Sequence, residues 1–116
     1  MPVSAISAGI LDRVAEAVAR HHREQHGHSP EITRAFAVAD MVIVRLTGAF
    51  TKTERELCTT EEGRKAVQSA RRDLRALTRR DVEAAVSKVV EAPVLRSYCD
   101  LDVRIGEQLE VYMLQL

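Results

Sequence analysis

Four histidines gather where the first predicted helix ends. His22 and His26 are four residues apart, so on a helix their side chains share one face and can chelate one metal ion. His28, just past Gly27, can complete the set. The alternative is a solvated basic cluster at the helix end, in which only His21 faces the core. Because this spacing is common, the sequence favours the solvated cluster, assigns no cofactor, and keeps His22, His26 and His28 as a metal hypothesis.

A basic stretch follows in the second half of the chain. Seven basic residues and one acidic residue lie between Arg64 and Arg80. Such an edge can bind a phosphate, an acidic protein or RNA. The stretch lacks the aromatic side chains on which single-stranded nucleic acids stack, and the four acids between Glu54 and Glu62 are available to neutralise it. We therefore expect a solvated helix face and no nucleic-acid partner.

One arginine of this stretch and one helix start suggest a narrower site. Thr51 followed by Glu54 is a capping-box signature for a short helix. Helix N-termini and arginines both suit anions. A small anion such as bicarbonate or phosphate, bound near Thr51 and Arg71, is therefore one hypothesis for the function.

Asp100 and Asp102 place two carboxylates beside a predicted loop. Such a pair can perform acid–base chemistry or bind a hard cation. No third carboxylate stands at cation-loop spacing and no glycine-rich phosphate cradle is present, so the pair is more typical of a turn cap at a strand end. The chain also has no G-x-S-x-G, no P-loop and no cysteine with a motif-placed histidine. We expect a protein that is not an enzyme, with Asp100 and Asp102 kept as candidate ligand-binding residues.

Composition limits what these residues can do. The chain has 116 residues, with 17 basic and 17 acidic side chains and a net charge of zero. The length predicts a single domain over residues 1–116, and the 46% hydrophobic share is that of a globular protein. Neutrality excludes the strong basic field of a small nucleic-acid binder. The zero net charge is also the sum of a basic helix edge and an acidic C-terminal hairpin. This local separation of charge favours a contact with a complementary protein or anion.

The cysteines and the apolar runs predict the compartment. Cys58 and Cys99 are 41 positions apart, which matches no zinc or redox motif, so we expect two reduced thiols. The N-terminus lacks the basic and apolar regions of a secretory signal. The longest apolar run, residues 41–44, is too short to span a bilayer. These features predict a soluble, cytoplasmic protein.

Helical periodicity predicts three or four helices. Residues 4–26 form one amphipathic helix with Ile6, Ile10, Val14, Ala17, Val18 and His21 on one stripe. A short helix runs from the Thr51 cap through Cys58, and a longer one begins at Thr59 with Ala66, Val67, Ala70, Leu74 and Leu77 on its stripe. Thr78 with Asp81 predicts a restart, because Asp81 would otherwise fall on that apolar stripe. The next stripe is Val82, Ala85, Val86 and Val89, and it ends before Pro93.

Alternating residues predict four strands in two hairpins. The apolar sides are Ile32, Phe36 and Val38 in residues 31–38, and Val42, Val44 and Leu46 in residues 41–47. In residues 94–101 they are Leu95, Cys99 and Leu101, and in residues 108–114 they are Leu109, Val111 and Met113. The predicted fold is α+β, in the order helix, hairpin, two or three helices, hairpin. Helices on one face of a mostly antiparallel four-stranded sheet would bury each of these sides.

The same order of pieces carries a resemblance over roughly residues 10–116. The matching residues are Gly27 and Pro30, Asp40 to Val44 with Leu46 and Gly48, Phe50 and Thr51 with Glu54 and Leu57, Gly63, Val67, Arg71 and Arg72, and Ser97 with Asp100 to Asp102. In these residues the chain resembles the MpsC-like domain, named after the Na⁺-translocating membrane-potential-generating system. It departs from the family at Ala92-Pro93, where a Thr-Gly pair is usual, and at Leu74, where an aromatic residue is frequent. Both departures put a shared ligand at those points in doubt.

The resemblance implies a link to bacterial systems associated with membrane potential, cation transport and inorganic-carbon supply. It brings no catalytic residues to carry over. Lacking a membrane segment, the domain is expected to be a soluble accessory or regulatory partner, and we predict a non-enzymatic interaction module. We expect it to bind other proteins and to form a homodimer, since the edge strands of an open sheet need covering. Small-anion binding and metal binding by the histidines are the alternatives.

Overall fold

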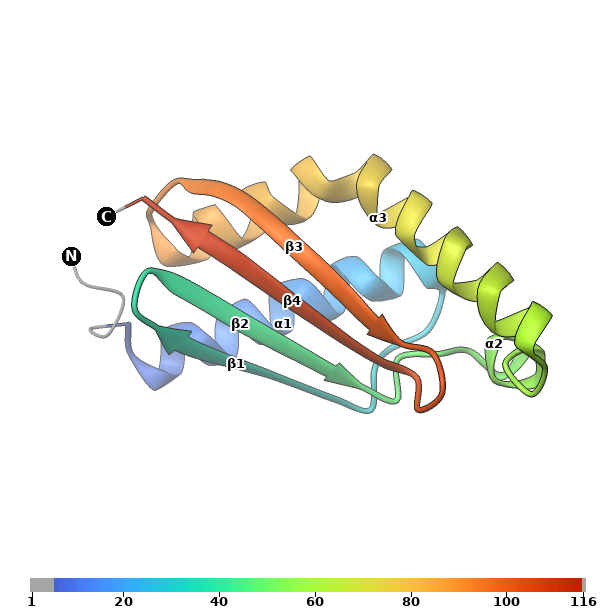
Figure 1. Ribbon diagram of the computed structural model, residues 1–116. Coiled ribbons are helices and arrows are strands. Elements are labelled where there is room, and N and C mark those ends of the chain that lie inside the picture. The colour runs from blue at the N-terminus through green and yellow to red at the C-terminus, as the bar shows by residue number, and fades with distance from the viewer. Residues whose placement is uncertain (1–5, 116) are drawn as a thin grey trace.

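Four antiparallel strands form one open sheet in the computed structural model, which describes residues 6–115 (Figure 1). The elements are α1 (Ala8–His26), β1 (Ile32–Val38), β2 (Met41–Thr47), α2 (Lys52–Leu57), α3 (Glu61–Val90), β3 (Val94–Asp102) and β4 (Glu107–Leu114). The strand order is β1-β2-β4-β3, so each hairpin supplies one edge strand and one central strand. Helices α1 and α3 lie side by side across one face, and the predicted α+β class and element order are confirmed.

Helix α1 is shorter than predicted at its start. Ser7 caps it by accepting a hydrogen bond from the Ile10 N–H at 3.1 Å, and the part of the prediction at residues 4–5 lies outside the described residues. Gly27 ends it in the left-handed conformation, with a φ of 68°. The prediction that His21 faces the core is wrong. His22 is the buried histidine, because it continues the four-residue spacing of the buried residues Val14 and Val18.

Helix α3 is continuous over 30 residues, so the predicted restart at Thr78 is wrong. The Thr78 hydroxyl donates to the Leu74 carbonyl at 3.0 Å, inside the helix, and does not cap a new one. The buried stripe consists of Gly63, Val67, Arg71, Val82 and Val86. Asp81 does not fall on this stripe: it is exposed, and the neighbouring Val82 is buried instead. Three residues of the predicted stripe, Ala66, Ala70 and Leu77, are exposed, Leu77 by 84%.

The helix-covered face of the sheet differs from the prediction on three strands. On β2, Val42, Val44 and Leu46 are buried as expected. On β1 and β4 the helices cover the opposite sides, which are Ala35 and Ala37 on β1, and Gln108, Glu110, Tyr112 and Leu114 on β4. Leu109, Val111 and Met113 therefore lie on the other face with Ile32, Phe36 and Val38. Alternation predicts which residues share a side, but it does not predict which side the helices cover.

Strand β3 contains an irregularity that moves one predicted residue. The register with β4 shifts between Val94 and Arg96, as at a β-bulge. Ser97, Cys99 and Leu101 alternate toward the helices, whereas Leu95 is 54% exposed and does not share their side. The bulge thus separates Leu95 from the two residues with which the alternation grouped it.

Gly63 allows α2 and α3 to approach each other. A Cβ atom at this position would lie 1.7 Å from the Leu57 carbonyl oxygen. Since that atom belongs to the backbone, Gly63→Ala should lower the free energy of unfolding by about 2 kcal/mol or more. Gly9→Ala is the control: its nearest atom is Ser7 Oγ at 3.8 Å, so this variant should be neutral or gain up to about 1 kcal/mol of helix propensity. Urea denaturation measures both, and equal stabilities would contradict the close approach.

Candidate functional site

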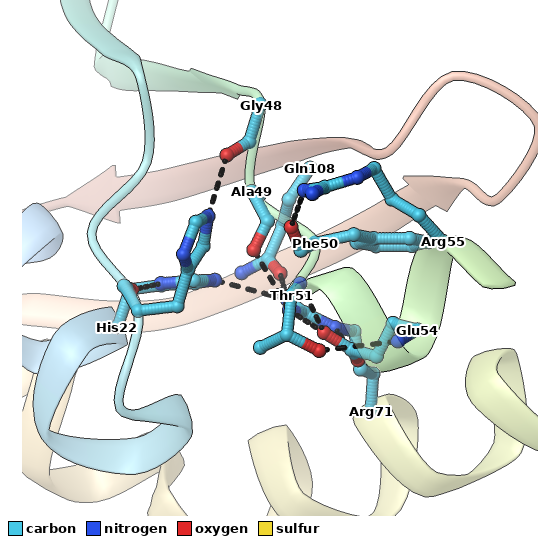
Figure 2. A network of polar contacts seen from close by, with 10 residues as sticks. His22, Gly48, Ala49, Phe50, Thr51, Glu54, Arg55, Arg71 and Gln108 are labelled. Atoms are coloured by element: carbon cyan, nitrogen blue, oxygen red, sulfur yellow. Dashed lines mark hydrogen bonds and ion pairs between the residues drawn. The ribbon is translucent and has the colours of Figure 1, made fainter.

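A buried arginine lies at the centre of a polar network that joins α3 to the sheet (Figure 2). Only 3% of the Arg71 side chain is exposed. Its guanidinium makes two hydrogen bonds to Glu54, from Nε to Oε2 at 2.6 Å and from Nη2 to Oε1 at 2.7 Å. Nη2 also donates to the Ala49 carbonyl at 2.9 Å, and Nη1 donates to Gln108 Oε1 at 3.2 Å and to His22 Nε2 at 3.0 Å. Each of the five N–H donors of a guanidinium therefore has a partner.

The segment between β2 and α2 supplies one wall of this network. The Phe50 ring centroid lies 4.5 Å from Arg71 Cζ, within the range of a cation–π contact. Thr51 caps α2: the Glu54 N–H donates to Thr51 Oγ1 at 3.1 Å, and the Thr51 N–H donates to Glu54 Oε1 at 2.9 Å. The predicted capping box is confirmed. It holds the Glu54 carboxylate against Arg71, as Figure 2 shows.

Arg71 also determines the charges of its neighbours. Burial opposes ionisation of Glu54, but hydrogen bonds from Arg71 and Thr51 outweigh it and lower the pKa of the carboxyl to about 2. Because Arg71 can only donate, His22 Nε2 accepts, and His22 Nδ1 donates to the His28 carbonyl at 2.8 Å. Burial, followed by the charge of Arg71, lowers the pKa of His22 to about 4. The network thus contains a charged ion pair beside a neutral imidazole.

A second buried charge continues the network along β4. Gln108 Nε2 donates to Glu110 Oε2 at 2.7 Å, and only 1% of Glu110 is exposed. Arg75 Nη2 donates to Glu110 Oε1 at 2.9 Å and to Ser97 Oγ at 2.9 Å, and the Tyr112 hydroxyl donates to Glu110 as well. Burial, then the charge of Glu110, raises the pKa of Tyr112 well above its usual value. Gln108 therefore links two buried ion pairs into one network.

Few groups in this interior are available for chemistry. Within residues 6–115, every buried side-chain nitrogen and oxygen has a hydrogen-bond partner. Burial raises the pKa of the Cys99 thiol to about 12, and it raises the pKa of Cys58 too, so neither thiol is an activated nucleophile. The network therefore holds three helices to the sheet, and its polar groups are used in doing so.

The structure brings Thr51 and Arg71 together, as the anion hypothesis expected. The group between them is the Glu54 carboxylate, which accepts from both the Thr51 N–H and the Arg71 guanidinium. An external anion would have to displace this carboxylate. Asp100 and Asp102 lie apart from this pair, on β3, where the Asp102 carboxylate accepts from the Arg104 N–H at 3.1 Å in the turn. That contact is the turn-cap role that the sequence favoured.

The three histidines of the metal hypothesis also come together. The ring centroids of His22 and His26 are 4.5 Å apart, and those of His22 and His28 are 6.5 Å apart. Both nitrogens of His22 are hydrogen bonded, and His28 Nε2 lies 3.1 Å from the Gly48 carbonyl. In the part of the chain that the structure describes, no three His, Cys, Asp or Glu side chains are placed to hold a metal ion.

Sequence reasoning missed Gln108, Glu110 and Arg75 as members of the network, and it gave Glu54 a capping role and a place among the acids that could neutralise the basic stretch, without pairing it with Arg71. One signal was available. Arg71 and Arg75 follow Val67 at four-residue intervals, so they continue the stripe that α3 buries. Arginines in phase with a buried stripe need acceptors opposite them, and the alternating polar residues of β4 supply these.

The sheet face away from α1 and α3, called here the open face, carries large apolar side chains. Strand register places Phe36, Ile43, Val111 and Tyr98 in one row across all four strands. Phe36 is 48% exposed and Tyr98 is 55% exposed. The neighbouring row is Val38, Met41, Met113 and Arg96. Antiparallel sheets covered on one side normally place polar residues on the other, so this apolar face departs from the usual pattern.

The fold and this arrangement define a small α+β domain with a hydrogen-bonded polar interior and an apolar open sheet face. The chain belongs to the family described as the Na⁺-translocating membrane potential-generating system (MpsC), whose family model matches residues 9–116. The predicted resemblance is thereby confirmed. No curated protein and no solved structure matches the chain. Among residues 6–115, no helix has the length and apolar character needed to cross a membrane.

Loss of the central arginine should be strongly destabilising. Arg71→Met removes all five hydrogen bonds and leaves Glu54 without its cation, which should cost about 3 kcal/mol or more of unfolding free energy. Arg72→Met changes the adjacent, exposed arginine in the same way and should stay within about 0.5 kcal/mol of the wild type. Urea denaturation compares the two variants. Similar losses in both would contradict the central place of Arg71.

The histidines should make stability fall in weak acid. Burial, then Arg71, lowers the pKa values of His22 and His26 from 6.5 to about 4, so the unfolded chain binds more protons between these pH values. These histidines do not affect the free energy of unfolding well above pH 6.5, and they lower it as the pH falls from 6.5 toward 4. We expect the unfolding free energy to drop by about 2 kcal/mol over this range.

His22→Gln tests the source of this drop. A glutamine can accept from Arg71 and donate to the His28 carbonyl without titrating, so the drop should become smaller. Glu54 stays ionised throughout the range, because its pKa is about 2. Chemical denaturation at a series of pH values measures the dependence. A flat wild-type profile, or one that His22→Gln leaves unchanged, would contradict the assignment.

Proposed function

We propose that this MpsC-family chain is a non-enzymatic accessory module that acts in a membrane-potential system by binding protein through its open sheet face. The single observation that carries this proposal is the row Phe36, Ile43, Val111 and Tyr98, which crosses the whole sheet on the side away from the helices. An exposed apolar patch of this extent on a small domain is typical of an interaction site. Family membership supplies the link to membrane potential.

The interior supports a binding role over a catalytic one. Catalytic groups need free hydrogen-bonding capacity toward a substrate, and in residues 6–115 the buried polar groups are bonded to one another. The anion alternative receives less support, because the Glu54 carboxylate lies between Thr51 and Arg71. We place the module in the cytoplasm, in keeping with its two free thiols.

Membrane potential in the host tests this function. In a strain that lacks the gene, wild-type protein should restore the potential reported by a potential-sensitive dye. Phe36→Glu puts a charge at the β1 end of the apolar row on the open face and should abolish restoration. Leu77→Glu makes the same kind of change at an exposed position of α3 and should restore the potential fully, because it leaves the open face intact.

His26→Ala is a second control. His26 lines a small polar crevice between α1 and α3, which Arg75 and Glu110 also line. This variant should also restore the potential. Restoration by Phe36→Glu would contradict the binding role of the open face. Loss with His26→Ala in a protein that remains folded would point to chemistry in the crevice and contradict the non-enzymatic assignment.

A further inference from the structure

We propose that the partner of the open face is a second copy of this chain, packed face to face about a two-fold axis that runs parallel to the strands. This inference rests on the proposed function and names its first partner. In this arrangement β1 of one copy lies over β3 of the other, and β2 lies over β4. Two four-stranded sheets then form a sandwich with the helices on its outer sides.

The apolar rows need a cover. On β1 the large side chains Ile32, Phe36 and Val38 are about half exposed, at 51%, 48% and 50%. On β4, Gln108 and Glu110 share the helix-covered side with Tyr112 and Leu114, and the open side carries Leu109, Val111 and Met113, with Leu109 exposed by 39%. The helix-covered face is apolar at Val42, Val44 and Leu46, so a sheet that also carries large apolar side chains on its open face is typical of one buried on both faces.

Charge complementarity identifies a second copy as the cover. The row next to the apolar one is Arg34, Arg45, Leu109 and Asp100, so it begins with a cation at one edge of the sheet and ends with an anion at the other. Arg45 pairs with Glu107 at 2.9 Å. Neither Arg34 nor Asp100 has an ion-pair partner among residues 6–115. Each of these two charges therefore remains available to the other copy.

The proposed two-fold axis brings these charges together. Rotation about an axis parallel to the strands keeps each row in place and exchanges the two edges of the sheet. Arg34 of one copy then faces Asp100 of the other, twice by symmetry. In the apolar row, Phe36 faces Tyr98 and Ile43 faces Val111. Face-to-face sheets lie about 10 Å apart, a distance that an arginine and an aspartate side chain can span between them.

The size of the face is sufficient for a dimer. Four strands about 4.8 Å apart and about seven residues long give a face of about 19 by 23 Å. Two such faces bury on the order of 1,000 Å² of accessible surface, which reaches the lower limit of specific interfaces. An axis across the strands would instead set β1 over β1, bring like charges to the same edge and place arginines over the apolar row. Only the axis parallel to the strands places Arg34 opposite Asp100 and also places the apolar row of one copy opposite the apolar row of the other.

A charge-swap series in sedimentation equilibrium tests this interface on the purified full-length chain. The wild type should be a dimer at micromolar concentrations. Arg34→Asp and Asp100→Arg should each raise the dissociation constant by about tenfold or more, because each places two pairs of like charges in contact. The double variant should return to within about threefold of the wild type. Arg72→Asp, an equal charge change on the exposed side of α3, should leave the dimer unchanged.

The outcomes separate this inference from the proposed function. A monomeric wild type, or a double variant no better than the single ones, would overturn the dimer. If the chain is monomeric and Phe36→Glu still fails to restore the membrane potential, another protein covers the open face. The dimer is then wrong, and the proposed function stands. If Phe36→Glu is monomeric yet restores the potential, the dimer stands and the function fails. Circular dichroism confirms that each variant is folded before comparison.

Discussion

The fold depends on giving a buried guanidinium a complete set of partners. An uncompensated charge inside a protein is very costly, so Arg71 dictates what surrounds it. Glu54 supplies the opposite charge from α2, His22 an acceptor from α1, Gln108 an acceptor from β4, and Ala49 a backbone carbonyl. Three segments far apart in the sequence, around His22, residues 49–54 and Gln108, therefore meet at one side chain of α3. Helix α2, only six residues long and without a buried residue, is explained by the carboxylate that it delivers.

This demand has a consequence on the other side of the sheet. Because Arg71 and Arg75 face β4, its helix-covered side must carry Gln108 and Glu110, and alternation then assigns the apolar residues of β4 to the open face. On β1 the close approach of α1 favours Ala35 and Ala37 inside, which leaves large side chains outside. The open side of β4 thus follows from the polar network, and the open side of β1 follows from the close approach of α1. It follows that the buried polar side chains of residues 6–115 hold the helices to the sheet, while large apolar side chains of β1 and β4 lie on the open face.

Much of this architecture follows from the sequence, and the exceptions have physical causes. Periodicity and capping residues predict the element order and the α2 capping box, and the resemblance in the matching residues predicts the family. Local pattern fails where a distant partner decides: Arg71 looks solvent-exposed until Glu54 and Gln108 are placed beside it. Alternation groups Leu109 with Val111 but cannot assign them a face. The bulge beside Leu95 leaves no local signal.

The proposed dimer requires contacts between the open faces of two copies of the chain. Isotope-filtered nuclear Overhauser measurements on an equal mixture of labelled and unlabelled chain test this most directly, since they detect only contacts between copies. The account predicts contacts between the ring of Phe36 in one copy and the ring of Tyr98 in the other, with none from α3 residues such as Leu77. Contacts between copies that arise from the helices, or none at protein concentrations well above the micromolar range, would contradict it.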